Sequence, residues 1–187
     1  MSESIFTAVI GIIGTLAGTI LGWFLNKISR CGKLKAFGVE WDERYELNDT
    51  GRMVDSPSYG EAEHYAYSIT LDIYNSSSDT KIMRDFRMEF LKARRVVVAN
   101  APLNIDDKSG LFCRAMGVLN VPPKSVVSLH LCGGFWRSKF GLFDEIDASS
   151  KVRLSYRDEK NADRHIMVDD LKNETRFDKI ARLRKND

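Results

Sequence analysis

The sequence has almost no net charge. Its 28 lysines and arginines nearly balance 26 aspartates and glutamates, which leaves a formal charge of +2 at pH 7. Proteins that bind nucleic acids usually present a strongly basic surface, so this balance argues against a nucleic-acid partner. The 187 residues contain no internal repeat and no low-complexity tract, so we expect one domain of ordinary size after any anchor.

Motifs that carry catalytic chemistry are also missing. No Gly-x-Ser-x-Gly sequence occurs, and Gly133-Gly134 lacks the Lys-Ser/Thr that completes a phosphate-binding loop. Asp106-Asp107 and Asp169-Asp170 are adjacent pairs, and adjacent strand residues point to opposite faces, so neither predicts an acid/base couple. His130 and Cys132 share a strand face, but nothing nearby completes a metal site. We therefore expect no enzyme activity, no cofactor and no metal.

Cysteine is scarce. The three cysteines, Cys31, Cys113 and Cys132, cannot all pair within one chain, and they form no Cys-x-x-Cys motif. This usage fits a reducing compartment. Acylation of Cys31 is an open alternative, because this cysteine directly follows the apolar segment described next. Asn75-Ser-Ser and Asn173-Glu-Thr match the glycosylation pattern, which matters only if the domain is exported.

Charged residues are absent from Ile5 to Leu25, a run of 21 residues. An α-helix of that length measures about 31 Å, which matches the hydrocarbon core of a bilayer. A soluble domain rarely contains a helix that is apolar all round for so long. We therefore predict a transmembrane helix over residues 5–26, preceded by a short tail over residues 1–4. A cleaved signal peptide is the rival interpretation, but it would have basic residues before a shorter apolar run.

The charges that flank this run are asymmetric. Only Glu3 and the free amine precede it, whereas a basic connector over residues 27–36 follows it, with Lys27, Arg30, Lys33 and Lys35. Positive flanks remain in the cytoplasm, so we expect the N-terminus outside and the remainder of the chain inside. The same four side chains are expected to lie at the membrane surface and to favour anionic membrane lipid.

The predicted helix has a face of small residues. At 100° per residue, an arc of about 80° holds Thr7, Gly11, Gly14, Gly18 and Gly22. Lipid tails provide no hydrophobic reason for two apolar helices to associate, so close backbone approach must supply the attraction. This face predicts a homo-oligomer or a partner membrane helix. The alternative is that glycine is simply common in membrane helices.

Alternating apolar and polar residues predict strands after the connector. The clearest strand runs from His64 to Tyr74 and places Tyr65, Tyr67, Ile69, Leu71 and Ile73 on one face. Residues 82–91 continue the pattern, with Ile82, Phe86, Met88 and Phe90 inward and Asp85, Arg87 and Glu89 outward. A helix over residues 82–94 is the alternative there. Phe37, Val39 and Trp41 predict a further half-buried strand.

Shorter strands complete the pattern. They are expected at residues 95–98 and 127–131 and in a hairpin formed by residues 152–156 and 166–168, with polar loops at residues 100–110 and 158–164. Seven or eight strands separated by turns indicate an all-β domain over residues 37–168. A β-sandwich, with an immunoglobulin-like arrangement as one form, is our prediction. A small β-barrel is the alternative, and the Cys…Trp…Cys spacing of true immunoglobulin domains is absent.

One passage resembles known domains in a general way. A strand–turn–strand region runs from Tyr67 to Leu91, and Val121-Pro-Pro-Lys-Ser follows before another strand. This arrangement is similar to small bacterial β-sandwich domains on single-pass membrane anchors. The resemblance covers about half the chain and carries no catalytic motif. It implies a β-sandwich held at a membrane.

Two segments are candidates for recognition. Residues 133–141 predict a loop with the aromatic and basic side chains Phe135, Trp136, Arg137, Lys139 and Phe140, types enriched in interface cores. The alternative is a loop that folds back over the core. Residues 169–187 predict a basic helical tail, either solvated or in contact with the membrane surface or a partner.

These observations favour a single-pass, membrane-anchored interaction or sensor module with a cytoplasmic β-sandwich. An unknown protein or small ligand is expected to bind the domain. The alternative is a membrane-acting effector whose glycine-faced helices oligomerise and perturb the bilayer. The helix has few polar residues, which argues against a water-filled pore between such helices.

Overall fold

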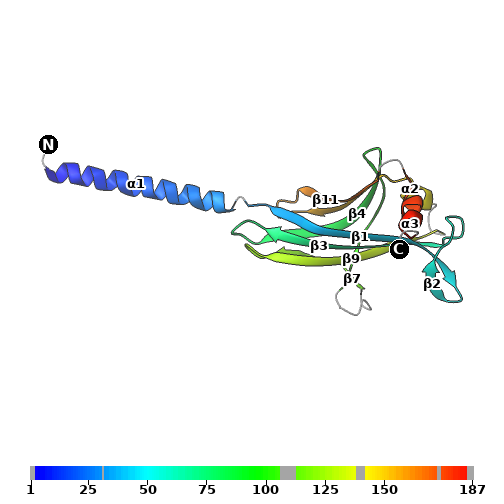
Figure 1. The fold of residues 1–187 in the computed structure, drawn as a ribbon. Helices are drawn as coiled ribbons and strands as arrows, with labels where there is room; N and C mark the ends of the chain where they lie inside the picture. The colour runs from blue at the N-terminus through cyan, green and yellow to red at the C-terminus, as the bar shows by residue number, and fades with distance from the viewer. Residues whose placement is uncertain (1–2, 31, 106–112, 138–141, 172–173, 185–187) are drawn as a thin grey trace.

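The computed structural model describes residues 3–30, 32–105, 113–137, 142–171 and 174–184. A long N-terminal helix, α1 (Glu3–Arg30), leads into two facing antiparallel sheets. Figure 1 shows α1 projecting from one end of the sheets, with the C-terminal helix α3 (Arg176–Arg184) at the opposite end. The β domain therefore lies beside only the last turns of α1, among the residues that the structure describes.

Two sheets form the domain. The first has the strand order β2-β1-β3-β9-β6-β7, and the second has the order β11-β10-β4-β5, with β8 paired to β4. The bounds are β1 (Leu34–Asp49), β2 (Arg52–Asp55), β3 (His64–Asn75), β4 (Lys81–Lys92), β5 (Arg95–Asn100), β6 (Leu103–Ile105), β7 (Cys113–Ala115), β8 (Leu119–Val121), β9 (Val126–Trp136), β10 (Lys151–Arg157) and β11 (Asp163–Asp170). This architecture confirms the predicted two-sheet sandwich and not the barrel.

Strand β3 is central to the core. The alternate side chains from Tyr65 to Ile73 are at most 3% exposed, and those between them are partly exposed, as predicted. Phe90 from β4 packs between the two sheets, with its ring centroid 5.8 Å from that of Tyr65 and 6.0 Å from that of Tyr67. Such edge-to-face contacts stabilise the sandwich in addition to the burial of apolar area.

Strand β1 departs from the predicted alternation. Its pairing with β3 shifts register between Phe37 and Glu40, around Gly38, whose φ is +59°. A bulge adds one residue to a strand and so reverses the side-chain phase. Phe37 is therefore 46% exposed, while Val39 and Trp41 pack against the core. The prediction that all three share the buried face is wrong for Phe37.

Strand β4 contains a second irregularity. The predicted strand is confirmed, so the helix alternative for residues 82–94 is wrong. Pairing with β10 shifts register between Arg84 and Arg87, and Asp85 adopts a φ of +54°. Met83 consequently takes the interior position predicted for Ile82, which is partly exposed.

The remaining elements fill the ends of the sandwich. The hairpin of β10 and β11 is confirmed. The predicted polar loop at residues 100–110 instead contains β6, which pairs with β9 and β7, while residues 106–112 lie outside the described part. Helix α2 (Phe143–Asp147) was not predicted; it buries Phe143 and Ile146 against the core.

The large apolar side chains of α1 that the structure describes are all exposed. The stretch Phe6–Ile28 comprises 23 residues of mean hydropathy 2.0, and its most apolar part is not buried in the structure. A side chain built on Gly11, Gly14, Gly18 or Gly22 would meet no atom of the chain within 4 Å. The helix is therefore long and apolar enough to cross a membrane, a property that anchors and signal sequences share.

Candidate functional site

The predicted recognition loop begins as a strand. Strand β9 continues to Trp136 and pairs Gly133 with Tyr67 and Gly134 with Ala66, so the loop prediction is wrong for residues 133–136. A side chain at Gly133 would collide with the ring of Tyr67, which explains why a glycine suits this stretch of strand. Phe135 packs against Phe90, with 5.7 Å between ring centroids. Lys139 and Phe140 lie outside the described residues.

Trp136 and Arg137 lie over the end of the sandwich that is distant from α1. Trp136 is 45% exposed and packs on His64, with 4.6 Å between the two ring centroids. The guanidinium carbon of Arg137 lies 4.7 Å from the Tyr59 ring centroid and 4.8 Å from that of Phe143. Arg137 also donates a hydrogen bond to the backbone carbonyl of Tyr59. These contacts favour the alternative in which the segment folds back over the core.

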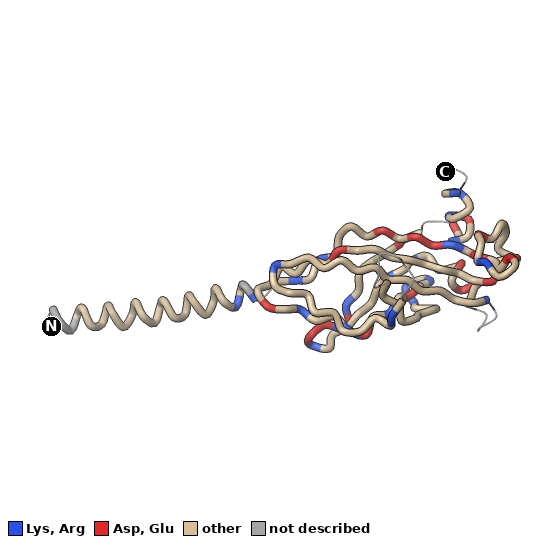
Figure 2. Tube along the Cα trace, turned by 90° about the horizontal axis from the view of Figure 1, so that it is seen from below, with Lys and Arg blue, Asp and Glu red and all other residues tan. Residues whose placement is uncertain are grey.

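A cleft of note lies at the other end, where α1 meets the sandwich. It encloses about 860 Å³ between the last turns of α1, the start of β1, the β3–β4 turn and the β10–β11 turn. We call it the junction cleft; its lining comprises Trp23, Asn26, Lys27, Arg30, Gly32, Lys33, Leu34, Asp79, Lys81, Tyr156, Asp158, Glu159, Lys160 and Arg164. Figure 2 shows basic segments gathering at this junction.

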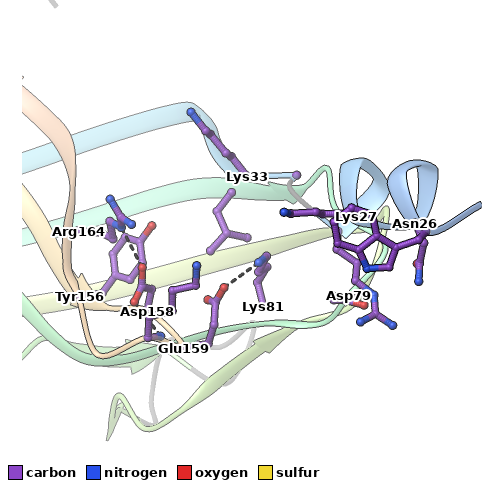
Figure 3. Close-up of a pocket in the computed structure, with 14 residues that line it drawn as sticks. Asn26, Lys27, Lys33, Asp79, Lys81, Tyr156, Asp158, Glu159 and Arg164 are labelled. Carbon is purple, nitrogen blue, oxygen red and sulfur yellow. Dashed lines mark hydrogen bonds and ion pairs between the residues drawn. The ribbon is translucent and has the colours of Figure 1, made fainter. Parts of the chain in front are cut away.

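The structure brings three of the four predicted membrane-surface residues into the junction cleft. Lys27, Arg30 and Lys33 line it, whereas Lys35 is exposed on β1 outside it. Across the cleft lie side chains from the β10–β11 turn, which the sequence marked only as polar (Figure 3). Charge density in that turn was the available signal, but nothing in the sequence places it beside α1.

Each acidic group in the cleft is engaged. Arg164 donates a hydrogen bond of 2.9 Å to Asp158, which also accepts the backbone N–H groups of Lys160 and Ala162 at 2.9 Å. Burial would raise the pKa of Asp158, but these hydrogen bonds outweigh it and hold the pKa below its ordinary value. The remaining acid–base pairs are Glu159–Lys81 at 2.7 Å and Asp79–Arg30 at 3.7 Å.

Glu159 responds in the same way. Burial would raise its pKa, but the hydrogen bond from the Lys81 ammonium lowers it overall. Both turn carboxylates therefore remain ionised at neutral pH and already form ion pairs with basic side chains. Neither is suited to act as a general acid.

Three cationic side chains in the cleft have no such neighbour. Among the described residues, the ammonium groups of Lys27, Lys33 and Lys160 form no ion pair with a carboxylate. Lys27 instead lies 4.9 Å from the ring centroid of Trp23, a cation–π contact. Six basic and three acidic residues line the cleft, so it has an excess of positive charge.

A buried amide fixes one wall of the cleft. Asn75 is fully buried and donates to the carbonyl groups of Asp79, Val121 and Pro122 at 2.8, 2.9 and 3.1 Å. The following residue, Ser76, exchanges hydrogen bonds with the backbone of Lys33 at 2.8 Å. The glycosylation pattern at Asn75 therefore lies on a buried side chain. Asn173 lies outside the described residues.

The remaining chemical candidates lie on the first sheet. The Sγ atoms of Cys113 and Cys132 are 3.3 Å apart, and burial, followed by the neighbouring Cys113 thiol, raises the pKa of Cys132 to about 11. His130 contacts Thr70 at 3.2 Å. Within the described ranges, no group of three His, Cys, Asp or Glu side chains is placed to hold a metal ion. Cys31 lies outside the described residues.

The C-terminal tail packs onto the domain. The predicted helix is confirmed as α3, with Ile180 buried and Arg176 fully buried. Figure 1 shows this helix at the end of the domain opposite α1. The helical part of the tail is thus not fully solvated.

Comparisons with known proteins identify the fold family. The family described as the YopI Ig-like domain matches residues 32–169. The SPbeta prophage-derived uncharacterized protein YopI of Bacillus subtilis (strain 168) is 25% identical over 131 residues, which cover 65% of this chain and 72% of that protein.

Two solved structures show weaker likeness, each at 12% identity. A protein assigned as ApaA from Bordetella pertussis has a TM-score of 0.36, with 76% of this chain and 96% of that chain covered. The Iho670 flagellar-like filament has a TM-score of 0.35, with 90% and 98% covered. Scores this low carry no argument, whereas the family match spans most of the β domain. The chain belongs to the YopI Ig-like domain family, and its two sheets form an Ig-like β-sandwich behind an N-terminal apolar helix.

Proposed function

We propose that this protein is a single-pass membrane protein whose helix holds an Ig-like interaction or sensor module at the cytoplasmic face. The observation that carries the proposal is the apolar stretch Phe6–Ile28, whose large side chains are all exposed and which ends directly in a basic, cleft-forming junction. An apolar surface of this extent is stable in lipid and not in water.

The direction of insertion follows from charge. Lys27, Arg30, Lys33 and Lys35 lie within one or two turns of the apolar stretch or on the adjoining strand, and such residues stay on the cytoplasmic side. A cytoplasmic domain also agrees with free thiols at Cys113 and Cys132. We extend to this chain the prophage origin described for the Bacillus subtilis relative, which makes a host membrane the surface it occupies.

We assign the domain a binding role and not an enzymatic one. The carboxylates of Asp158 and Glu159 remain ionised and paired with cationic side chains, so the junction cleft offers charge recognition in place of acid/base chemistry. The bound partner is a protein or a small ligand that contacts the β domain. We propose no nucleic-acid partner, because the chain carries a net charge of only +2.

A second candidate function is a membrane-acting effector. It is favoured by the glycine face of α1, which is open along its length and allows close packing against another helix. The Thr15 and Thr19 hydroxyls count against a water-filled pore, because they donate to the backbone carbonyls of Gly11 and Thr15 at 2.8 and 2.9 Å. We therefore propose that α1 associates with a second copy or a partner helix to cluster the domain.

The topology predicts which thiols reagents reach. With Cys31 and Cys132 replaced by serine, the exposed Cys113 is expected to resist a membrane-impermeant maleimide in intact spheroplasts and to react fully after detergent permeabilisation. The measurement is the mass shift of the purified protein. A variant with Cys113 also replaced provides the background.

Two results would contradict the topology. Full labelling in intact spheroplasts would place the domain outside. Recovery of a soluble chain that has lost residues up to the end of the apolar stretch would identify a signal sequence and remove the anchor from the proposal.

A further inference from the structure

The junction cleft begins where the membrane span ends. The apolar stretch finishes at Ile28, and the cleft lining includes Trp23, Lys27 and Arg30 from the same end of α1. Tryptophan and lysine at a helix end lie at the headgroup level of a bilayer. If α1 spans the membrane as proposed above, the cleft therefore opens into the layer of lipid headgroups.

The charges of the cleft leave positive groups available. The carboxylates of Asp158 and Glu159 are matched by Arg164 and Lys81, while Lys33 and Lys160 have no carboxylate partner among the described residues. Figure 3 shows Lys27 and Asn26 at the helix end across from the paired turn residues. An anion entering this space gains ammonium donors without having to break an existing ion pair.

The volume and lining fit a headgroup. At about 860 Å³ the cleft lies within the range of small-molecule sites, and Trp23 and Leu34 provide apolar surface beside the charged groups. A phosphodiester with a glycerol backbone presents phosphate oxygens to lysine and apolar carbon to the indole ring. A free phosphate ion would leave the apolar part of the lining without a contact.

We infer that the junction cleft binds the phosphate of an anionic phospholipid headgroup, with Lys33 and Lys160 from the sandwich and Lys27 from α1 as its cationic contacts. This inference rests on the proposed membrane anchor. It makes the angle between helix and domain depend on lipid, because one bound headgroup then contacts both parts of the chain.

The test measures lipid retention by the full chain. Protein purified in a nonionic detergent is titrated with phosphatidylglycerol or phosphatidylcholine, and retained lipid is counted by native mass spectrometry. Each juxtamembrane lysine is expected to contribute about fivefold to affinity for an anionic surface. Lys33→Gln with Lys160→Gln should therefore weaken phosphatidylglycerol retention about 25-fold, while phosphatidylcholine binds weakly to all variants.

The matched control removes the same charge at the far end of the domain. Lys92→Gln with Lys151→Gln replaces an exposed and a half-buried lysine, which pair with Glu145 and Asp170 at 3.9 and 2.8 Å, and it should retain lipid as the parent does. Unchanged circular dichroism shows that each variant is folded, as expected for exposed positions.

Each other outcome overturns the inference. Equal retention of both lipids, or equal loss in both double variants, means that no specific site exists. Displacement of phosphatidylglycerol by inorganic phosphate at equal concentration identifies the free ion as the ligand. Alkaline carbonate extraction of cell membranes tests the anchor separately, so that release of the protein there contradicts the proposed function and not the charge chemistry of the cleft.

Discussion

Replacement of Arg176 by methionine is expected to lower the free energy of unfolding by about 3–5 kcal/mol, the range for breaking a buried ion pair from one side. Arg176 is fully buried, and its guanidinium donates to Glu43 and Asp169 at 2.9 Å and to Ser149 at 2.7 Å. Methionine leaves the nearly buried Glu43 carboxylate with fewer donors. Losing several kcal/mol is a large fraction of the stability of a domain this size.

The surrounding groups add to the cost. Glu43 also accepts the hydroxyl of Tyr65 at 2.6 Å and the ammonium of Lys179 at 3.0 Å. Burial, followed by the charge of Glu43, raises the pKa of Tyr65 well above its ordinary value, so this hydroxyl remains a donor at neutral pH. The network connects β1, β3, β11 and α3, and its loss should detach the C-terminal helix from the sandwich.

The loss in free energy of unfolding is measured by urea denaturation of the full chain in nonionic detergent, with circular dichroism as the signal. Arg182→Met is the control, because Arg182 is 57% exposed and pairs with Glu174 at 2.9 Å, a contact worth less than about 1 kcal/mol. The double variant Arg176→Met with Glu43→Leu should recover part of the loss, since no buried carboxylate at position 43 is then left without the guanidinium. If Arg176→Met were no more destabilising than Arg182→Met, the network would not hold α3 in place.

The sequence predicted the fold where one face of a strand is continuously buried. The alternation from Tyr65 to Ile73 survives because β3 lies between β1 and β9, pairs with β9 without a register shift, and has the extra residue of its other pairing on β1. Alternation failed at Phe37 and Ile82, where bulges at Gly38 and Asp85 reverse the phase. A bulge inserts one extra residue into a strand without altering the types of residue the strand contains, so a period-two pattern in the sequence does not reveal it.

The candidate site was predictable on one side only. Lys27, Arg30 and Lys33 were identified because their position after an apolar run has a direct physical meaning. Asp158 and Lys160 were missed because their role depends on a turn more than 120 residues away in sequence lying beside the end of α1. The basic composition of residues 169–187 does not distinguish Arg176 from a surface residue, since a single sequence does not show that two acids from other strands enclose it.

The second large effect is expected within the membrane. Gly18→Ile places a branched side chain at the centre of the glycine face and should force paired helices apart. In the single chain a side chain at this position meets nothing within 4 Å, so the helix itself tolerates the change. Insertion should also persist, because isoleucine is at least as apolar as glycine. The substitution therefore tests contact with another helix in isolation from folding.

The reduction in helix self-association is measured as the crosslinking yield in membranes, with the variants expressed at matched levels. Contacts between transmembrane helices contribute about 0.6–2 kcal/mol each, so losing two or three should reduce self-association tenfold or more. Ile13→Leu is the control, because Ile13 is exposed away from the glycine face and the change conserves volume. Its crosslinking should match that of the parent.

The outcomes separate the two candidate functions. If Gly18→Ile crosslinks to itself as well as the parent does, self-association through the glycines is wrong, and a different partner helix becomes the explanation for the open face. If Gly18→Ile abolishes both the crosslinking and the ion leakage that the parent causes in the expressing cells, the effector function is favoured over the sensor function. If crosslinking is lost and neither protein causes leakage, α1 clusters the domain without perturbing the bilayer. The function then resides in the sandwich and its junction cleft, because those parts of the chain are the same in both variants.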